Sequence, residues 1–214
     1  MNRVMNRKVF ILIIGVLVVG STTFDYWRSV RDPRAAMPEA LIGTLLPQPR
    51  SLPEFVLSDH TGAEFGRSRF LGRWTLVFFG YTSCPDICPT TMLTLKGVEE
   101  ELRGAGAEPP QVVLVSVDPA RDDAEKLRDY VSYFGEDFLG VRGEDDQLHT
   151  LALQIGAMYQ RGEPDASGFY EVAHSASIFL VDPQARVVAA FSPPHQPADI
   201  AGRLSMIREI YGRG

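Results

Sequence analysis

Hydrophobic and polar positions follow one another along the chain in segments typical of alternating strands and helices. Short, nearly continuous apolar runs predict strands that are buried on both faces. Longer segments with apolar residues on one helical face predict helices that cover a sheet. The expected strands are 55–57, 74–81, 112–117, 138–141, 177–181 and 186–191, and the expected helices are 90–104, 122–134, 145–155 and 197–211.

This order of elements indicates an α/β domain with a mixed central sheet. Strands that alternate with helices favour parallel pairing, with helices on both faces of the sheet. The last two strands are joined by the short turn 182–185, so we expect them to add an antiparallel edge. One domain is therefore expected over residues 50–214. Prolines recur in residues 28–49 without apolar periodicity, which indicates an extended tether.

The first 27 residues predict an N-terminal membrane anchor, a single transmembrane helix. The basic residues Arg3, Arg7 and Lys8 come first. The uncharged stretch from Val9 to Phe24 follows, slightly shorter than the roughly 20 apolar residues of a typical span. Basic residues before this stretch and none directly after it predict that the domain lies on the extracytoplasmic (periplasmic) side. A cleaved signal peptide is the alternative, but we find no clear A-x-A-like cleavage site and favour the anchor.

The charge of the chain argues against a nucleic-acid partner. The protein has 214 residues and a formal net charge of −6, although its N-terminal segment is basic. Phosphate backbones are bound by Lys and Arg, so a domain this acidic is a poor candidate for nucleic-acid binding. Hydrophobic residues make up 45% of the chain and charged residues 22%, which is ordinary for a globular protein with one core.

Cys84 and Cys88 are the only cysteines and mark the candidate site. They lie in the stretch 84–89 (CPDICP), between a predicted buried strand and a predicted helix. Pro89 disfavours helical angles at Cys88 and suits the first helical position, so Cys88 is expected at or beside the helix N-cap. The helix N-terminus is expected to lower the pKa of a thiol there. The pair can form a structural disulfide, act as a redox-active dithiol or bind a soft metal ion.

Three stretches of the chain together carry a family resemblance. They are residues 80–91 (GYTSCPDICPTT), 115–122 (VSVDPARD) and 170–175 (YEVAHS), the last leading into the predicted strand 177–181. In sequence, order and spacing they resemble the Sco/SenC family of copper-binding proteins, and the resemblance extends over residues 50–212. Two positions depart from the family pattern: Ser83 stands where many members have His, and Ala173 where Asp usually precedes the histidine.

The resemblance implies a thioredoxin-like domain that binds copper through Cys84, Cys88 and His174. Thiolates are soft ligands that select Cu(I), and an imidazole lets the same site hold Cu(II). It also implies a metallochaperone that delivers copper to the dinuclear copper site of cytochrome c oxidase during assembly. The implied partners are the copper-bearing subunit of that enzyme, a copper donor protein and the membrane. On this interpretation the protein binds and transfers copper, has no catalytic residue and is not an enzyme.

The same thiols leave an enzymatic alternative open. In a thiol–disulfide oxidoreductase, Cys84 and Cys88 would reduce the cysteines of the target before it receives metal. Such enzymes need no histidine ligand and more commonly have two residues between their cysteines. Thioredoxin-type oxidoreductases also place a cis-proline before the strand that corresponds to 177–181, and residues 174–177 contain no proline. Zinc is disfavoured, because two sulfurs and one nitrogen are one ligand short of a structural zinc site.

Two acidic residues near these motifs are secondary candidates. Asp86, between the thiols, is either a solvated turn residue or a group that tunes the site and contacts the partner. Asp118 follows a predicted strand and is expected to order a loop rather than to bind metal. Residues 160–171 contain glycines, a proline and several charges, which predicts a loop or short hairpin. If His174 is a ligand, this segment is a natural hinge that brings it to the metal.

The remaining histidines and two methionines are weaker candidates. We interpret His60, His149 and His195 as surface residues, with His195 close to the site only if its proline-rich loop folds over it. Met92 and Met158 are possible thioether ligands, but both are expected in helical core positions.

Overall fold

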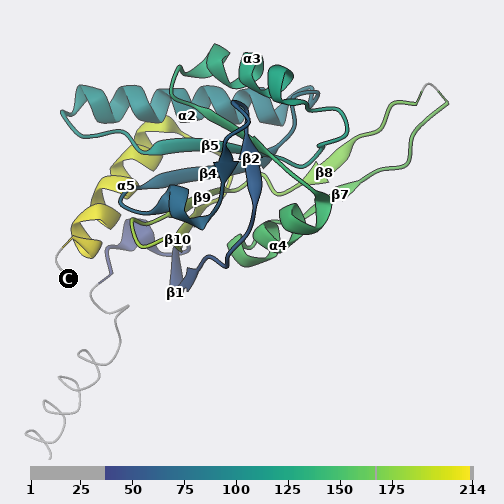
Figure 1. Cartoon of the computed structure of the whole chain (residues 1–214). Helices are drawn as coiled ribbons and strands as arrows, with labels where there is room; N and C mark the ends of the chain where they lie inside the picture. Colours follow the sequence, from purple (N-terminus) through teal and green to yellow (C-terminus); the bar gives the residue numbers. More distant parts are fainter. Residues whose placement is uncertain (1–36, 167, 213–214) are drawn as a thin grey trace, which may run out of the picture. The chain divides into compact units, whose positions relative to one another are not determined.

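The computed structural model describes residues 37–166 and 168–212 (Figure 1). The predicted membrane anchor and residues 28–36 of the predicted tether lie outside these ranges. Within them, no helix combines the length and the apolar character that crossing a bilayer requires. The chain divides into two compact units, Met1–Ile42 and Gly43–Gly214. The described end of the first unit contains the short 3-10 helix η1 (Glu39–Leu41), and the second unit contains the sheet.

The second unit is built on an eight-stranded mixed sheet with the order β1-β10-β9-β4-β5-β6-β2-β3. The central strands β4, β5 and β6 are parallel, and the flanking pairs are antiparallel. The predicted mixed sheet is therefore confirmed. The strands are β1 (Leu45–Ser51), β2 (Leu57–Asp59), β3 (Glu64–Phe65), β4 (Thr75–Gly80), β5 (Gln111–Ser116), β6 (Leu139–Arg142), β9 (Ile178–Val181) and β10 (Arg186–Phe191).

Four α-helices accompany the sheet in the described part of the second unit. They are α2 (Ile87–Gly104), α3 (Ala124–Phe134), α4 (Asp145–Ile155) and α5 (Pro197–Tyr211), with a further 3-10 helix η2 (Arg67–Phe70). Right-handed crossovers from β4 to β5 and from β5 to β6 place α2 and α3 on the same face. Helix α5 packs against α2, and Figure 1 shows α4 on the other side of the sheet from α2 and α3. The predicted helices on both faces are thus observed.

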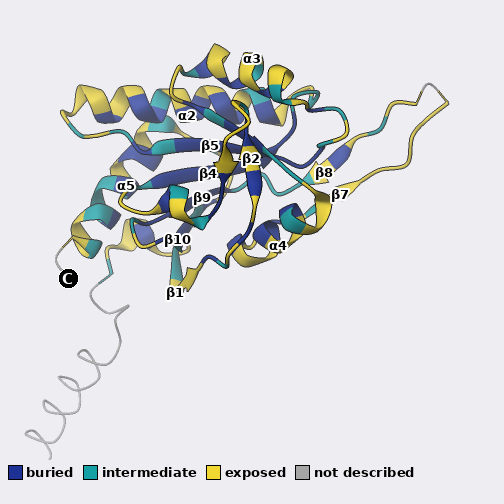
Figure 2. Cartoon of the chain, viewed as in Figure 1, coloured by how far each residue is buried: buried dark blue, intermediate teal, exposed yellow. Residues whose placement is uncertain are grey.

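Strand β4 forms the centre of the core, because every one of its residues is buried (Figure 2). Its four consecutive apolar residues, Leu76 to Phe79, have no exposed surface. The continuous apolar pattern of this segment therefore reflects cover on both faces, as predicted. This rigid strand ends at Gly80, directly before the loop that carries the first cysteine.

The start of the domain differs from our expectation. Residues 45–49, which we assigned to the tether, form most of β1, which pairs with β10 in an irregular register between Leu45 and Arg50. Pro47 and Pro49 lack backbone N–H groups, and an edge strand tolerates that loss. Because β1 covers β10, the antiparallel pair β9–β10 lies inside the sheet and not at its edge.

Helix α2 also begins earlier than we expected. It starts at Ile87 with Asp86 as N-cap, so Cys88 lies within its first turn rather than beside the N-cap. Proline only biases the backbone of the residue before it, and Cys88 is fully buried beneath the end of β4. We attribute the helical conformation of Cys88 to this packing, which outweighs the local preference.

Candidate metal centre

The two thiols lie where β4 passes into α2. Cys88 is fully buried, and its sulfur packs against the end of β4. A Cβ atom added to Gly80 would lie 2.8 Å from Cys88 Sγ and 2.8 Å from Phe78 Cε1, so this position requires glycine. Cys84 is half-buried in the preceding loop, where its backbone N–H donates to the Tyr81 carbonyl at 3.3 Å. Both cysteines are free thiols.

His174 reaches the thiols from a separate two-stranded sheet. This sheet is a hairpin formed by β7 (Tyr159–Arg161) and β8 (Val172–His174). The loop between the two strands extends away from the rest of the domain (Figure 1). The sequence prediction of a loop or short hairpin before His174 is therefore confirmed.

The imidazole of His174 has a defined orientation. Its Nδ1–H donates to the Ser175 carbonyl at 3.2 Å, while its Nε2 lies 3.4 Å from Cys88 Sγ. Phe78 and Tyr81 contact the ring edge-on, with centroid distances of 5.7 and 5.9 Å. The hydrogen bond at Nδ1 selects the tautomer whose Nε2 lone pair is free to bind a metal ion.

The three side chains converge on one point of the domain. The two sulfurs and the nearer imidazole nitrogen all lie within 4.8 Å of one another, and among the described residues these form a group able to hold a metal ion. Cys84 and His174 open on a cleft of about 570 Å³, which the β7–β8 hairpin and Asp86 also line, whereas Cys88 is fully buried and does not line it. Two soft sulfurs and one nitrogen suit a copper ion.

Burial determines the protonation of the Cys88 thiol and of the His174 imidazole. It raises the pKa of the Cys88 thiol, and the smaller opposing effect of a backbone hydrogen bond from Tyr81 does not offset it. Our expectation of a lowered thiol pKa at the helix start is therefore wrong for Cys88. Burial lowers the pKa of His174, which favours the neutral imidazole. The neutral ring can bind a metal ion directly, whereas Cys88 must first lose its proton.

The weaker candidate residues from the sequence differ in burial and in their position relative to the Cys84–Cys88–His174 cluster. Asp86 is exposed and lines the cleft, and its side chain makes no capping hydrogen bond to α2. His195 does not join the cluster, since its Nε2 lies 2.8 Å from the Ala176 carbonyl. Met92 is buried in α2 as predicted. Met158 is 75% exposed, so its assignment to the core is wrong, because it follows the end of α4 and leads into β7.

The other two histidines lie apart from the cluster. His60 Nδ1 accepts a hydrogen bond from the Gly140 backbone at 3.1 Å. His149 is exposed on α4 and its ring contacts that of Tyr159. Asp118 orders a loop, as expected, through contacts with Arg121 and Tyr170.

Sequence patterns did not identify the residues that support the cluster. Gly80, Phe78 and Tyr81 place Cys88 and His174, yet they resemble ordinary strand residues. Only Gly80 carried a usable signal, because a glycine that ends a buried strand often marks a close approach by another group.

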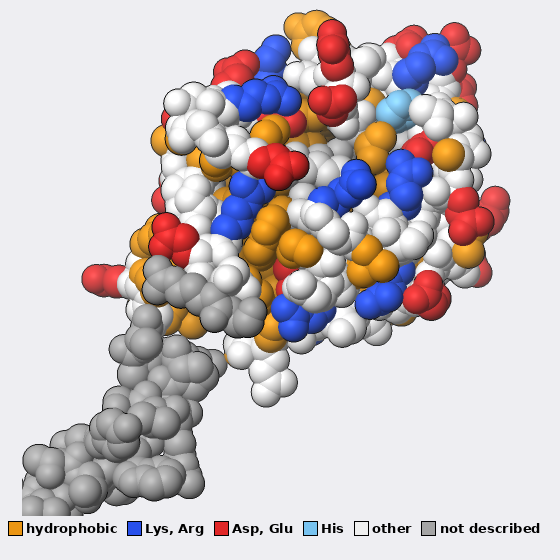
Figure 3. All heavy atoms as spheres, turned by 60° about the vertical axis from the view of Figure 1, so that its left-hand side comes forward, with side chains coloured by type: hydrophobic (Ala, Val, Ile, Leu, Met, Phe, Trp, Pro, Cys, Tyr) orange, Lys and Arg blue, Asp and Glu red, His pale blue; other side chains and the backbone are white. Residues whose placement is uncertain are grey.

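A second depression lies at the opposite end of the parallel strands. It measures about 840 Å³ and is lined by residues such as Arg73, Arg103, Glu99 and Asp137. Figure 3 shows basic, acidic and apolar side chains intermixed on this side of the molecule. Neither cysteine nor histidine lines the depression, so it offers no soft donor set for copper.

Comparison with known proteins places this site in a family. The SCO1/SenC family profile matches residues 44–209. Human mitochondrial SCO2 is 37% identical over 131 residues, which cover 61% of this chain and 49% of that protein, so the chain spans about half the length of this relative.

Solved structures of the same family have the same fold. Apo Sco1 of Thermus thermophilus is 36% identical, with a TM-score of 0.68 over 77% of this chain and 95% of that chain. The copper-bound ScoI of Arabidopsis thaliana is 27% identical, with a TM-score of 0.68 over 73% and 98% of the two chains. These similarities confirm the predicted thioredoxin-like fold, and the chain belongs to the SCO1/SenC family.

Proposed function

We propose that this protein is a membrane-tethered copper chaperone that binds copper through Cys84, Cys88 and His174. The observation that carries the proposal is the convergence of two sulfurs and one imidazole nitrogen within 4.8 Å at an open cleft. The copper-bound structure of a family member supports the choice of metal. By family membership, the recipient is the dinuclear copper site of cytochrome c oxidase during assembly.

The different exposure of the ligands suits transfer by ligand exchange. Cys88 is buried beneath β4, whereas Cys84 and His174 are half-buried at the rim of the cleft. Incoming thiolates or imidazoles from the recipient would therefore displace Cys84 and His174 ahead of Cys88. Copper is the cargo of this exchange, and the protein does not act as a turnover catalyst.

The proposed partners follow from this role. A copper donor protein would load the site, and the copper-bearing subunit of cytochrome c oxidase would receive the ion. Residues 1–27 would anchor the domain on the periplasmic side of the membrane. An anchor confines the search for a membrane-bound recipient to two dimensions and raises the effective concentration.

Copper titration of the purified domain tests the proposal directly. We expect about one tightly held ion per chain, with a sulfur-to-Cu(II) absorption band characteristic of thiolate ligation. Transfer is then followed by mixing the loaded domain with the soluble copper-bearing domain of the recipient. A protein that binds no copper under reducing conditions, or binds it equally well without its cysteines, would contradict the proposal.

Copper affinity is expected to rise with pH around neutrality. Because burial raises the pKa of Cys88, the metal-free protein holds a proton there that copper must displace. Because the pKa of His174 is lowered, its ring is already neutral and releases no proton when copper binds. With at least one proton released per ion, the apparent affinity should increase at least about tenfold per pH unit. Competition titrations with a chelator calibrated at each pH measure this slope, and an affinity independent of pH would be inconsistent with it.

Copper binding is expected to order the β7–β8 hairpin. His174 ends β8, so a bond between its imidazole and the metal ties this hairpin to α2. Hydrogen exchange in residues 160–174 should therefore be slower in the copper-loaded protein than in the metal-free protein. The buried strand β4 provides the internal control, and identical protection of residues 160–174 in the two states would argue against a hinge.

A thiol–disulfide oxidoreductase is the second candidate, favoured by one observation. Both thiols are free and Cys84 is half-buried at the cleft, where a target could reach it. In that reaction the two thiols would pass two electrons and two protons to a target disulfide and become a disulfide themselves. Loss of activity in Cys84→Ser with full activity in His174→Ala would favour the enzyme over the chaperone.

A further inference from the structure

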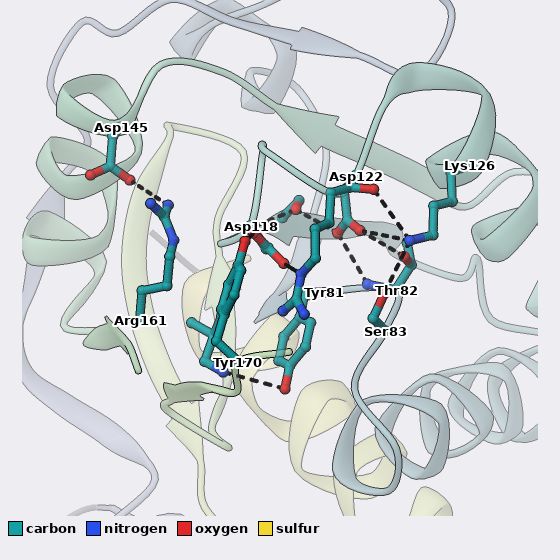
Figure 4. Close-up of polar contacts among 12 residues, drawn as sticks. Tyr81, Thr82, Ser83, Asp118, Asp122, Lys126, Asp145, Arg161 and Tyr170 are labelled. Atoms are coloured by element: carbon teal, nitrogen blue, oxygen red, sulfur yellow. Dashed lines mark hydrogen bonds and ion pairs between the residues drawn. The ribbon is translucent and has the colours of Figure 1, made fainter. Parts of the chain in front are cut away.

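One segment without any candidate ligand contacts both halves of the metal centre. We call residues 118–126, which join β5 to α3 and include the first turn of that helix, the bridging segment. Figure 4 shows it between the hairpin that carries His174 and the loop that carries Cys84. The cysteine half and the histidine half do not follow each other in the sequence, so their relative position depends on such tertiary contacts.

The first half of the bridging segment contacts the hairpin. Asp118 is fully buried, forms an ion pair with Arg121 and accepts a hydrogen bond from the Tyr170 hydroxyl at 2.7 Å. The Arg121 guanidinium lies over the Tyr170 ring, 3.7 Å from its centroid. Hydrogen bonds to a charged group in a buried setting are stronger than ordinary surface contacts. Tyr170 therefore attaches the hairpin firmly, four positions before His174.

Tyr81 extends this contact to the imidazole itself. Arg121 also lies over the Tyr81 ring, 5.5 Å from its centroid, and that ring contacts His174. The Tyr81 hydroxyl accepts a hydrogen bond from the Val172 backbone at 3.4 Å. The hairpin is thus held at Tyr170, two residues before β8, and at Val172, the first residue of this strand, which ends in His174.

The second half of the bridging segment contacts the cysteine loop. Asp122 is fully buried and accepts hydrogen bonds from the backbone and the hydroxyl of Thr82, at 3.0 and 2.6 Å. Lys126 Nζ donates to Ser83 Oγ at 3.0 Å, directly before Cys84. Ser83 is one of the two departures from the family pattern, and here its side chain connects the loop to α3.

We propose that the bridging segment sets the position of His174 relative to the two thiols, with Tyr170 as the positioning residue of the histidine half. This inference rests on the proposed copper function and assigns a role to residues that touch no metal. Release of Tyr170 would let the hairpin move while the cysteine loop stays in place. Cu(II) binding, which depends on the imidazole, should then weaken more than Cu(I) binding, which the thiolates dominate.

The variant Tyr170→Phe tests this role, because it removes the hydroxyl and keeps a ring over Arg121. We expect about tenfold weaker Cu(II) binding, the scale of one hydrogen bond to a charged group, with a changed sulfur-to-Cu(II) band. Cu(I) affinity should stay close to that of the wild type. In the metal-free protein, the Val172 amide should exchange faster. The control is Tyr133→Phe, since Tyr133 is 78% exposed on α3.

Combination with His174→Ala separates positioning from general stability. If Tyr170 acts through His174, then Tyr170→Phe should have no further effect on Cu(II) binding once the imidazole is gone. The inference would be overturned if Tyr170→Phe lowered Cu(II) affinity equally in the wild type and in His174→Ala, or if Tyr170→Phe alone bound Cu(II) like the wild type. If His174→Ala alone binds Cu(II) normally, the proposed ligand set fails instead, so the two failures are distinguishable.

A second variant covers the case in which Tyr170→Phe does not fold. Thr82→Val removes the hydroxyl bonded to Asp122 and keeps a side chain of similar size. It loosens the cysteine half, so Cu(I) and Cu(II) binding should both weaken about tenfold. Unchanged binding of both ions in the folded variant would overturn the role of the bridging segment.

Discussion

Replacement of His174 by alanine is expected to weaken Cu(II) binding by at least about 100-fold and to change its thiolate absorption band. Loss of a group that merely orients a metal ligand costs 10–100-fold in affinity, and loss of the ligand itself costs more. His174 supplies the sole nitrogen of the group found among the described residues. Cu(I) should be retained more strongly, because two thiolates remain. Chelator competition and absorption spectra on the same samples measure both effects.

The exposed His149 provides a matched control for this experiment. It lies on α4 near the other side of the hairpin and lines a neighbouring cleft together with His174. His149→Ala should leave Cu(II) affinity and spectrum unchanged. Equal losses in the two variants would indicate a general effect of histidine on copper uptake, and no loss in His174→Ala would remove this residue from the ligand set.

Replacement of Gly80 by alanine is expected to damage both the fold and the site. The added methyl group would lie 2.8 Å from Cys88 Sγ and 3.2 Å from Leu114 Cδ1. Overpacking of this kind costs about 1–3 kcal/mol of the free energy of unfolding. Because β4 is buried along its whole length, the Cys88 sulfur and the Phe78 ring, which contacts His174, are the groups that must shift. We therefore expect weaker binding of both Cu(I) and Cu(II), unlike the oxidation-state preference of His174→Ala.

Denaturant unfolding of the metal-free protein measures the loss of stability in Gly80→Ala, and copper titration of the folded variant measures the loss of copper binding. Gly202→Ala in α5 is the control, because apart from its chain neighbours and the nearby backbone of its own helix no atom lies within 4 Å of the position of an added Cβ. It should be neutral or stabilise the helix by up to about 1 kcal/mol. Wild-type stability and wild-type copper binding in Gly80→Ala would show that Cys88 does not depend on this close approach.

The predicted and observed folds agree for those elements whose burial produces a regular hydrophobic pattern within their own sequence. The apolar run of β4 and the periodic segments of α3 and α4 are visible in the sequence because each is covered in a regular way. Strand β1 was missed because its prolines look like a tether, and its pairing partner β10 lies far along the chain. The hairpin strands β7 and β8 are short and largely exposed, so their residues carry little periodicity.

The candidate site shows the same division. Cys84 and Cys88 could be identified from local sequence, and His174 from its resemblance to a family motif. Gly80, Tyr81 and Tyr170 could not, because they act through contacts across the fold. The pKa of Cys88 was misjudged for a related reason: the helix start is a local feature, whereas burial beneath β4 is not.

The sequence by itself therefore determined the four helices and the strands β4, β5, β6, β9 and β10, the pair of thiols and the family to which the site belongs, whereas β1 and β3 were missed and the predicted strand 55–57 overlaps β2 only at Leu57. Only the tertiary structure decided that an imidazole 86 positions from Cys88 lies 3.4 Å from its sulfur. It also decided which nitrogen faces that sulfur and which segment joins the two halves. Local patterns record periodicity within one element, whereas these properties arise from packing between elements that the chain brings together only on folding.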